Sequence, residues 1–162
     1  MKKKLLAGLL MVTLSLSVVG CGAKESQETT GGENQKVESQ QQQSEEKVYQ
    51  YYTADQVKEA IEKGDDIILV DIQVEEEWNK HHIKGAISTK AYPVKTDEER
   101  GKVQAVIPKL EGDNPIIVVC PGGKGGAQRT INYLSESGIK DERLFILENG
   151  QGGWPYDELL EK

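Results

Sequence analysis

The chain has 162 residues, of which 36% are hydrophobic and 29% charged, and its formal net charge is −7 at pH 7. This composition is that of an ordinary globular protein, and the length favours one domain plus a less ordered segment over two full domains. The acidic balance argues against nucleic acid as a partner, because proteins that bind it carry basic surfaces for the phosphates.

The N-terminus has the pattern of an export signal. Lys2, Lys3 and Lys4 precede an uncharged and largely apolar run from Leu5 to Val19. This run is shorter than the about 20 residues that a transmembrane helix requires. The pattern therefore favours a cleavable signal over a permanent membrane span, which is the alternative.

The signal ends in Val18-Val19-Gly20-Cys21, which resembles the lipobox of bacterial lipoprotein precursors. The resemblance implies that residues 1–20 are removed and that Cys21 is diacylated on its sulfur. Two acyl chains hold a soluble domain on a membrane, whereas one holds it only marginally. We therefore expect an extracytoplasmic protein anchored to the cell membrane by its lipid. The alternative is a plain secretory peptide in which Cys21 has no role.

Residues 21–48 are predicted to form a disordered tether. Between Lys24 and Lys47, Val37 is the only aliphatic residue, and the stretch includes the run Gln40 to Gln43. Such a composition cannot bury enough apolar surface to fold. The alternative reading of the glutamine run is a recognition segment for a partner. The folded domain is then expected over residues 49–162.

Helices in this domain are predicted from capping boxes and from apolar residues spaced by about one helical turn. Thr53 and Gln56 form the first box, and Thr96 and Glu99 form the second. The predicted helices are 54–63 ended by Gly64, a short turn at 75–80, a helix from Thr96 that could include Val103, Val106, Ile107 and Leu110, and a helix through Ala127, Ile131 and Leu134.

Strands are predicted from short apolar runs between these helices. They are Ile67 to Val70, Gly85 to Ile87, Ile116 to Val119 and Leu144 to Leu147. Strands that alternate with helices are typical of an α/β fold with three layers, in which a mainly parallel central sheet is flanked by helices.

The segment after Val119 carries the chemistry. A buried strand delivers Cys120, and a glycine-rich loop of Pro121, Gly122, Gly123, Lys124 and Gly125 precedes a helix. Ligands of α/β sheets bind at this edge, and the loop amides and the helix start favour negative charge there. They would favour a thiolate or persulfide on Cys120, the nucleophilic form. The alternative is that Cys120 fills a core position.

Three motifs, in chain order, resemble those of the rhodanese family. The family has an Asp at a strand end followed by a Glu-aromatic pair and a His-Ile-x-Gly-Ala segment, then a six-residue loop that begins with Cys, then a closing Gly-Gly-Trp element. Here these are Asp71 to Gln73 with Glu76, Glu77 and Trp78, His82 to Ala86, Cys120 to Gly125 with Gly123 at the usual glycine, and Gly152-Gly153-Trp154.

This resemblance covers residues 49 to 160 and implies the rhodanese fold. For active members it also implies a sulfurtransferase, which takes a sulfane sulfur from thiosulfate or a persulfide and passes it to a thiol or cyanide. Cys120 would be the catalytic nucleophile that carries the persulfide, and the backbone amides of Gly122 to Gly125 would cradle the anion. The expected partners are a small anionic sulfur donor and a thiol acceptor. We expect a monomer without a cofactor.

Several positions depart from the family pattern. Pro121 stands where many active members have Arg, and Gly125 stands where they have Arg or Thr. Lys124 is therefore the only charge within the loop. Gln73 stands where an Arg commonly pairs with Asp71, so that ion pair is absent or rebuilt. These losses motivate an alternative function, a non-catalytic module that binds sulfur species or docks a partner. A Cys-dependent phosphatase, a further alternative, would need an Arg where Gly126 stands.

Other polar residues have plainer interpretations. His81 and His82 are adjacent and lack the spacing of metal ligands, so no metal site is expected and His82 is predicted to be structural. Asp71, Glu76 and Glu77 could form an acid pair, but we interpret them as strand-end and helix-face residues. Arg129 could help to screen a bound anion or could be solvated.

Overall fold

The structure is a computed structural model that describes residues 47–162; the export signal, Cys21 and most of the predicted tether lie outside the described residues. The domain boundaries therefore stay predictions. No helix within residues 47–162 is long and apolar enough to cross a membrane.

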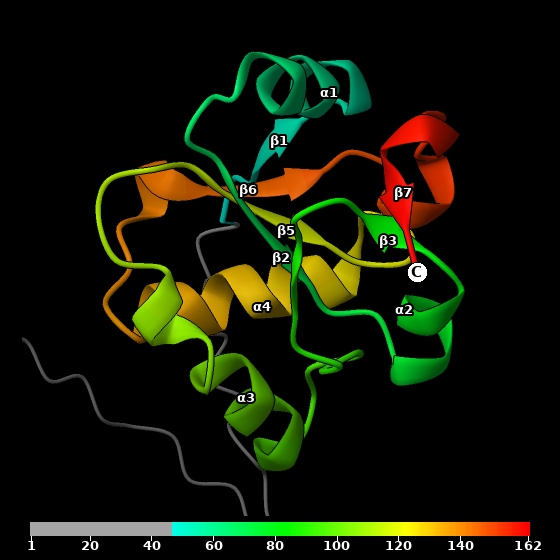
Figure 1. The fold of residues 1–162 in the computed structure, drawn as a ribbon. Helices are drawn as coiled ribbons and strands as arrows, with labels where there is room; N and C mark the ends of the chain where they lie inside the picture. Colours follow the sequence, from blue (N-terminus) through cyan, green and yellow to red (C-terminus); the bar gives the residue numbers. More distant parts are fainter. Residues whose placement is uncertain (1–46) are drawn as a thin grey trace, which may run out of the picture. The chain divides into compact units, whose positions relative to one another are not determined.

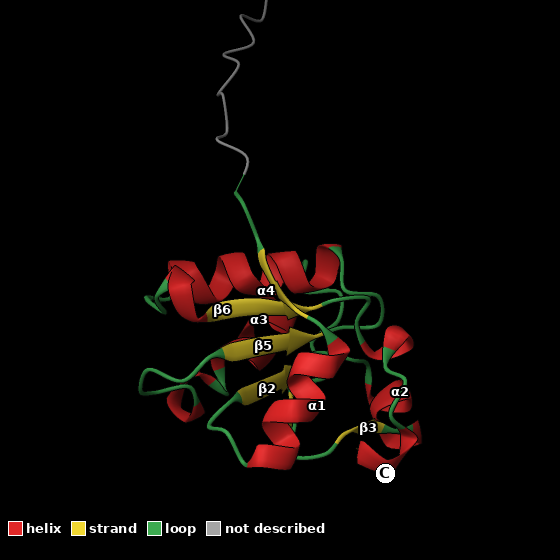
Figure 2. Ribbon diagram, turned by 90° about the horizontal axis from the view of Figure 1, so that it is seen from above, coloured by secondary structure: helices red, strands yellow, loops and turns green. Residues whose placement is uncertain are grey.

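A five-stranded sheet forms the centre of the domain, in the order β1-β6-β5-β2-β4. All of its strand pairs are parallel. Figure 2 shows β6, β5 and β2 running side by side. The strands are β1 (Gln50–Tyr52), β2 (Ile68–Asp71), β4 (Ile87–Ser88), β5 (Ile116–Val119) and β6 (Leu144–Leu147).

Helices cover both faces of this sheet, which confirms the predicted α/β fold (Figure 1). They are α1 (Ala54–Lys63), α2 (Glu75–Lys80), α3 (Asp97–Gln104) and α4 (Gly125–Glu136). Residues of α3 and α4 share one apolar cluster with the sheet, and Val57 of α1 belongs to the cluster on the opposite face. The capping boxes predicted at Thr53 and Thr96 are both present.

Two predicted elements differ from the structure. The helix that begins at Asp97 ends at Gln104, and a 3₁₀ turn, η1 (Ile107–Lys109), follows it. Pro108 explains the break, because proline lacks a backbone donor and disfavours the α conformation of the residue before it. The strand predicted at 85–87 is replaced by β4 and by a separate strand, β3 (His82–Ile83).

The C-terminal segment folds back on this region. β7 (Leu160–Glu161) pairs with β3 in an antiparallel ribbon. Two 3₁₀ turns, η3 (Gln151–Gly153) and η4 (Asp157–Leu159), lie between β6 and β7, and a further turn, η2 (Asp141–Arg143), precedes β6. β1, β7 and these turns were not predicted, because two- and three-residue elements leave no periodic pattern.

Strand β5 decides where Cys120 lies. All of its residues are buried, and they alternate between the two faces of the sheet as the period of a strand requires. Ile116 and Val118 join the cluster with α3 and α4, and Ile117 and Val119 join the cluster with α1. Cys120 continues this alternation and belongs to the α3–α4 cluster.

Candidate active site at Cys120

Cys120 lies at the carboxyl end of β5, as the sequence predicts, and is a free cysteine. Its residue surface is only 1% exposed. In this conformation the thiol therefore lies beneath the loop and against the core, rather than open to solvent. The catalytic and the core-filling interpretations of Cys120 both fit this position.

The loop after Cys120 is held by the segment that contains the closing glycines. The amide of Gln151 donates to the carbonyl oxygen of Cys120 at 2.8 Å, and the amide of Gly152 donates to that of Pro121 at 2.9 Å. In the sequence this segment is recognisable only as a family motif. The structure shows its physical role, which is to fix the backbone of the Cys120 loop.

Two glycines make this close approach feasible. Gly150 has φ +60, and a Cβ there would lie 2.0 Å from the carbonyl oxygen of Cys120. Gly123 has φ +63, and a Cβ there would lie 2.6 Å from the amide nitrogen of Asn149. Positive φ and the lack of space both require glycine. The Gly123 at the family's usual loop glycine is thus explained by packing against residues 147–150.

The start of α4 differs from the starts of α1 and α3. Thr53 and Thr96 cap those two helices with their hydroxyl groups, and acidic residues follow in each first turn. The N-cap residue of α4 is Lys124, which makes no capping hydrogen bond, and the first turn holds no acidic residue. The first amides of a helix lack partners within the helix, and its positive end attracts anions. This helix start is therefore suited to an anion.

The surroundings of Gly126 argue against the Cys-dependent phosphatase, which would need an Arg at this position. A Cβ at position 126 would lie 2.7 Å from the ring of Tyr92 and 3.3 Å from Ile72. A phosphatase arginine at this position would need that ring to move. Tyr92 also lines a cavity of about 520 Å³ to which α2 and α3 contribute, together with Val74, Glu75, Thr89, Lys90, Glu99 and Lys102.

A buried carboxyl group ends the neighbouring strand. Asp71 pairs in register with Val119 and accepts hydrogen bonds from Gln73, at 2.7 Å from its backbone amide and 2.9 Å from its side-chain amide. Hydrogen bonds from a neutral amide thus take the place of the ion pair with an arginine. Burial raises the pKa of Asp71 to about 6, against the lowering effect of these hydrogen bonds and of the two histidines.

The two histidines have different surroundings. The ring of His82 stacks on Trp78 with centroids 3.5 Å apart, and its Nδ1 lies 3.1 Å from the carbonyl oxygen of Trp78. His81 reaches the loop-holding segment instead, because its Nδ1 lies 3.2 Å from Nε2 of Gln151. Gln151 is buried, and its Oε1 has no hydrogen-bond partner among the described residues. No sequence signal predicted this contact.

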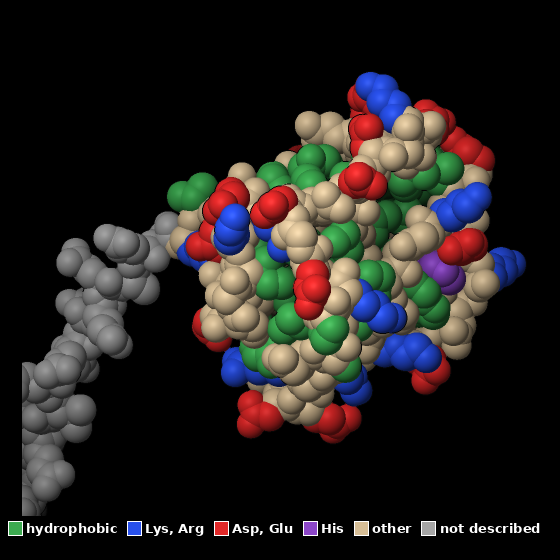
Figure 3. Space-filling model, turned by 60° about the vertical axis from the view of Figure 1, so that its left-hand side comes forward, with side chains coloured by type: hydrophobic (Ala, Val, Ile, Leu, Met, Phe, Trp, Pro, Cys, Tyr) green, Lys and Arg blue, Asp and Glu red, His purple; other side chains and the backbone are tan. Residues whose placement is uncertain are grey.

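The remaining candidates are not brought to Cys120. Glu76 is exposed and Glu77 half-buried on α2, and both pair with Lys80, so they form no acid pair with Asp71. Within residues 47–162 no cluster of His, Cys, Asp and Glu is suited to hold a metal ion. Figure 3 shows acidic and basic side chains mixed over the face in view, and most of the ion pairs join exposed residues.

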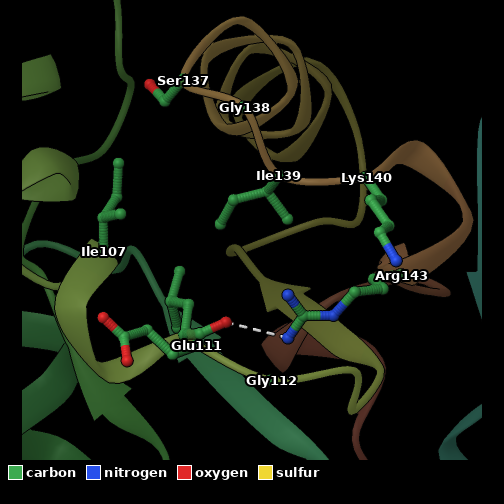
Figure 4. Close-up of a pocket in the computed structure, with 9 residues that line it drawn as sticks. Ile107, Glu111, Gly112, Ser137, Gly138, Ile139, Lys140 and Arg143 are labelled. Carbon is green, nitrogen blue, oxygen red and sulfur yellow. Dashed lines mark hydrogen bonds between the residues drawn. The ribbon is translucent and has the colours of Figure 1, made fainter.

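A further cavity of about 300 Å³ lies at the opposite end of α4 (Figure 4). Arg143 is the buried cation in its wall, and it donates to the carbonyl oxygens of Asn114 and Leu110 at 2.9 and 2.8 Å. These bonds tie the loop before β5 to the turn before β6. Arg143 therefore has a structural role there.

Comparison with known proteins identifies the family. The model of the rhodanese-like domain matches residues 53–155. The match spans more than half of the chain, so the chain belongs to the rhodanese-like domain family. No curated protein matches the chain.

Solved structures agree with this assignment at the level of the fold. A Bacillus halodurans protein is 24% identical, with a TM-score of 0.55 over 69% of this chain and 76% of the other. The rhodanese-like domain of an Anabaena protein is 21% identical, with a TM-score of 0.51 over 66% and 74%. A Rhodopseudomonas palustris protein of unknown function, described as a possible tyrosine phosphatase, is 20% identical, with a TM-score of 0.53 over 65% and 79%.

Proposed function

We propose that the domain is a sulfurtransferase that carries sulfane sulfur as a persulfide on Cys120. The observation that supports this function best is the placement of one free thiol under a loop that is fixed from the other side by Gln151 and Gly152 and ends at an uncapped helix start. Fixed backbone donors aimed at developing negative charge are an efficient source of stabilisation.

The reaction has two steps. The Cys120 thiolate attacks the sulfane sulfur of thiosulfate, the sulfur–sulfur bond of the donor breaks, and sulfite leaves with the bonding electron pair. Cys120 then carries a persulfide anion. In the second step a thiolate or cyanide attacks the terminal sulfur, which leaves as a new persulfide or as thiocyanate and regenerates the Cys120 thiolate. The amides of the loop and of the helix start would bind the donor anion and then the persulfide.

We also propose the setting that the N-terminus predicts. Lipidation of Cys21 would anchor the protein outside the cell membrane, and residues 21–48 would hold the domain away from the lipid surface. Replacing Cys21 by Ser should abolish incorporation of labelled palmitate and release the protein from the membrane fraction. Retention of the label in that variant would contradict the lipid anchor.

Mass spectrometry of the intact protein tests the sulfur transfer. After incubation with thiosulfate and removal of excess donor, the wild-type protein should gain the mass of a sulfur atom, and cyanide should remove it. Cys120→Ser should gain nothing, whereas Cys21→Ser should react like the wild type. A wild-type protein that gains no sulfur from either thiosulfate or a small persulfide would rule the proposal out.

The burial of Cys120 favours a second candidate, a module that binds sulfur species or docks a partner without turnover. A thiol with 1% exposure must be uncovered before a second substrate can reach it. In that case the protein would accept sulfur but would release it slowly. Steady-state production of thiocyanate separates the two functions, because only the sulfurtransferase shows many turnovers per Cys120.

A further inference from the structure

Arg129 lies one helical turn after the last residue of the Cys120 loop. Residues i and i+4 share a face of a helix, and helical side chains point back toward its start. The Arg129 side chain accordingly lies over Gly125, with Nη1 3.1 Å and Cζ 3.9 Å from the place of a Cβ at position 125. The guanidinium occupies the space that a side chain on the sixth loop residue would need.

The protein holds this side chain in place without neutralising it. Nε of Arg129 donates to the carbonyl oxygen of Pro93 at 2.8 Å, and the residue is half-buried. Within the part of the chain that the structure describes, no carboxylate lies within 4.0 Å of the guanidinium. The terminal Nη groups remain available as donors, and their fork matches the oxygens of a planar or tetrahedral anion.

A cation in this position is unfavourable unless an anion joins it. The start of a helix carries a partial positive charge, so acidic residues stabilise it and basic residues destabilise it. The first turns of α1, α2 and α3 follow this rule with acidic residues. The start of α4 instead has Lys124 at its N-cap and the Arg129 guanidinium over Gly125, without an acidic residue in the turn.

We infer that Arg129 is an anion-binding residue of the Cys120 loop and that its Nη groups hold the sulfonate oxygens of thiosulfate. The inference rests on the proposed function. Gly125 and Arg129 are then one feature, because the glycine leaves the space that the arginine fills. The charge on the sulfonate remains on its oxygens when sulfite leaves, so Arg129 would contribute to binding of the donor and of the leaving group alike.

Steady-state kinetics with thiosulfate and cyanide test this role. Arg129→Gln should raise the KM for thiosulfate by about tenfold with a much smaller change in kcat, as expected when binding is lost equally from the ground and transition states. Arg129→Lys should recover only part of the loss, because an ammonium lacks the fork. Arg100→Gln, which removes an exposed arginine from α3, is the matched control and should leave the KM unchanged.

A relocation variant separates anion binding from a purely structural role. Arg129→Ala should show the same rise in KM, and adding Gly125→Arg to it should lower the KM again, because removal of Arg129 clears the three atoms nearest to a Cβ at position 125. A structural arginine that mainly ties α4 to Pro93 would not be rescued from position 125. Unfolding in urea identifies any variant that is merely destabilised.

Calorimetric titration of sulfite into Cys120→Ser protein keeps the inference testable if turnover is absent. Loss of sulfite binding on adding Arg129→Gln would support the anion site even where the wild type gains no sulfur, and only the proposed function would then fail. Equal sulfite affinity with and without Arg129, or an unchanged KM for thiosulfate in Arg129→Gln, would overturn the inference.

Discussion

Two neighbouring strands of the sheet end in opposite ways. β2 ends in Asp71, a buried carboxyl group that has hydrogen bonds from Gln73 but no cation within ion-pair distance among the described residues. β5 is followed directly by Cys120, whose loop leads to Lys124 and a helix start without acidic residues. One strand end thus holds an acid without a cation, and the other holds donors and cations without an acid.

The carboxyl group at the end of β2 costs stability when it is ionised, whereas the loop after β5 could bind an anion. Both strand ends lack arginines that the family resemblance leads one to expect. At β2 the neutral Gln73 replaces the arginine within the same buried corner, and the result is a carboxyl group with a raised pKa. At β5 the backbone is fixed by residues 149–152, and the charge comes from α4. The second arrangement places the Arg129 guanidinium over the helix start, and no carboxylate among the described residues lies within ion-pair distance of it.

The largest loss of stability is expected when Gly150, which contacts the Cys120 loop, is replaced. In Gly150→Ala the new Cβ would overlap the carbonyl oxygen of Cys120 and would require an unfavourable positive φ. Overpacking and left-handed backbone strain together should cost about 3 kcal/mol of unfolding free energy. Unfolding in urea measures this loss, and labelling of Cys120 by thiosulfate should slow at the same time.

Gly138 provides the control for this substitution. It also has positive φ, at +93, but no atom lies within 4 Å of a Cβ there. Gly138→Ala should therefore cost only the backbone strain, about 1 kcal/mol, and should leave the labelling of Cys120 unchanged. Equal losses in the two variants would show that the contact between residues 120 and 150 does not matter.

The next largest effect concerns Asp71 at the end of β2, whose protonation should make the stability of the domain depend on pH. The pKa of Asp71 is about 6 in the folded protein, against 3.8 as the ordinary value. Between these values the folded protein holds a proton that the unfolded chain has released, so stability falls as pH rises. Above pH 6 the ionised Asp71 should lower the unfolding free energy by up to about 3 kcal/mol.

Asp71→Asn should remove this dependence. The difference in unfolding free energy between the variant and the wild type should shift in favour of the variant as pH rises from 4 to 7, while other carboxyl groups contribute equally to both proteins. Urea unfolding at these two pH values gives the measurement. A constant difference would mean that Asp71 is ionised in the folded protein throughout, as it would be with a cationic partner.

The sequence is informative where a pattern repeats or a cap has a fixed spacing. The buried strands at Ile116 and Leu144, the boxes at Thr53 and Thr96, and the parallel α/β layers all have such signals, and the structure confirms them. The position of Cys120 at a strand end follows from the same patterns. Its depth does not, because the exposure of a thiol depends on the loop that covers it.

Contacts between distant segments were beyond the reach of sequence patterns. The amide of Gln151 on Cys120 and the contact of His81 with Gln151 each depend on how loops pack in space. The position of Arg129 over Gly125 follows from their spacing on α4, but the hydrogen bond of Arg129 to Pro93 again joins distant segments. The sequence contains the glycines that allow these contacts, but it does not show which residue each glycine accommodates. Gly150 and Gly125 look alike in the chain, yet one accommodates a backbone and the other an arginine.

The smallest change in stability is expected when a capping residue replaces Lys124 at the start of α4. In Lys124→Asp the new carboxylate can accept a hydrogen bond from the first turn and lies at the positive end of the helix, so the domain should gain about 1 kcal/mol in unfolding free energy. The same carboxylate would compete with thiosulfate for these donors, and labelling of Cys120 should slow. Lys124→Ser caps the helix without a charge and separates the two causes. If both variants stabilise the domain but label as fast as the wild type, the start of α4 does not bind the donor.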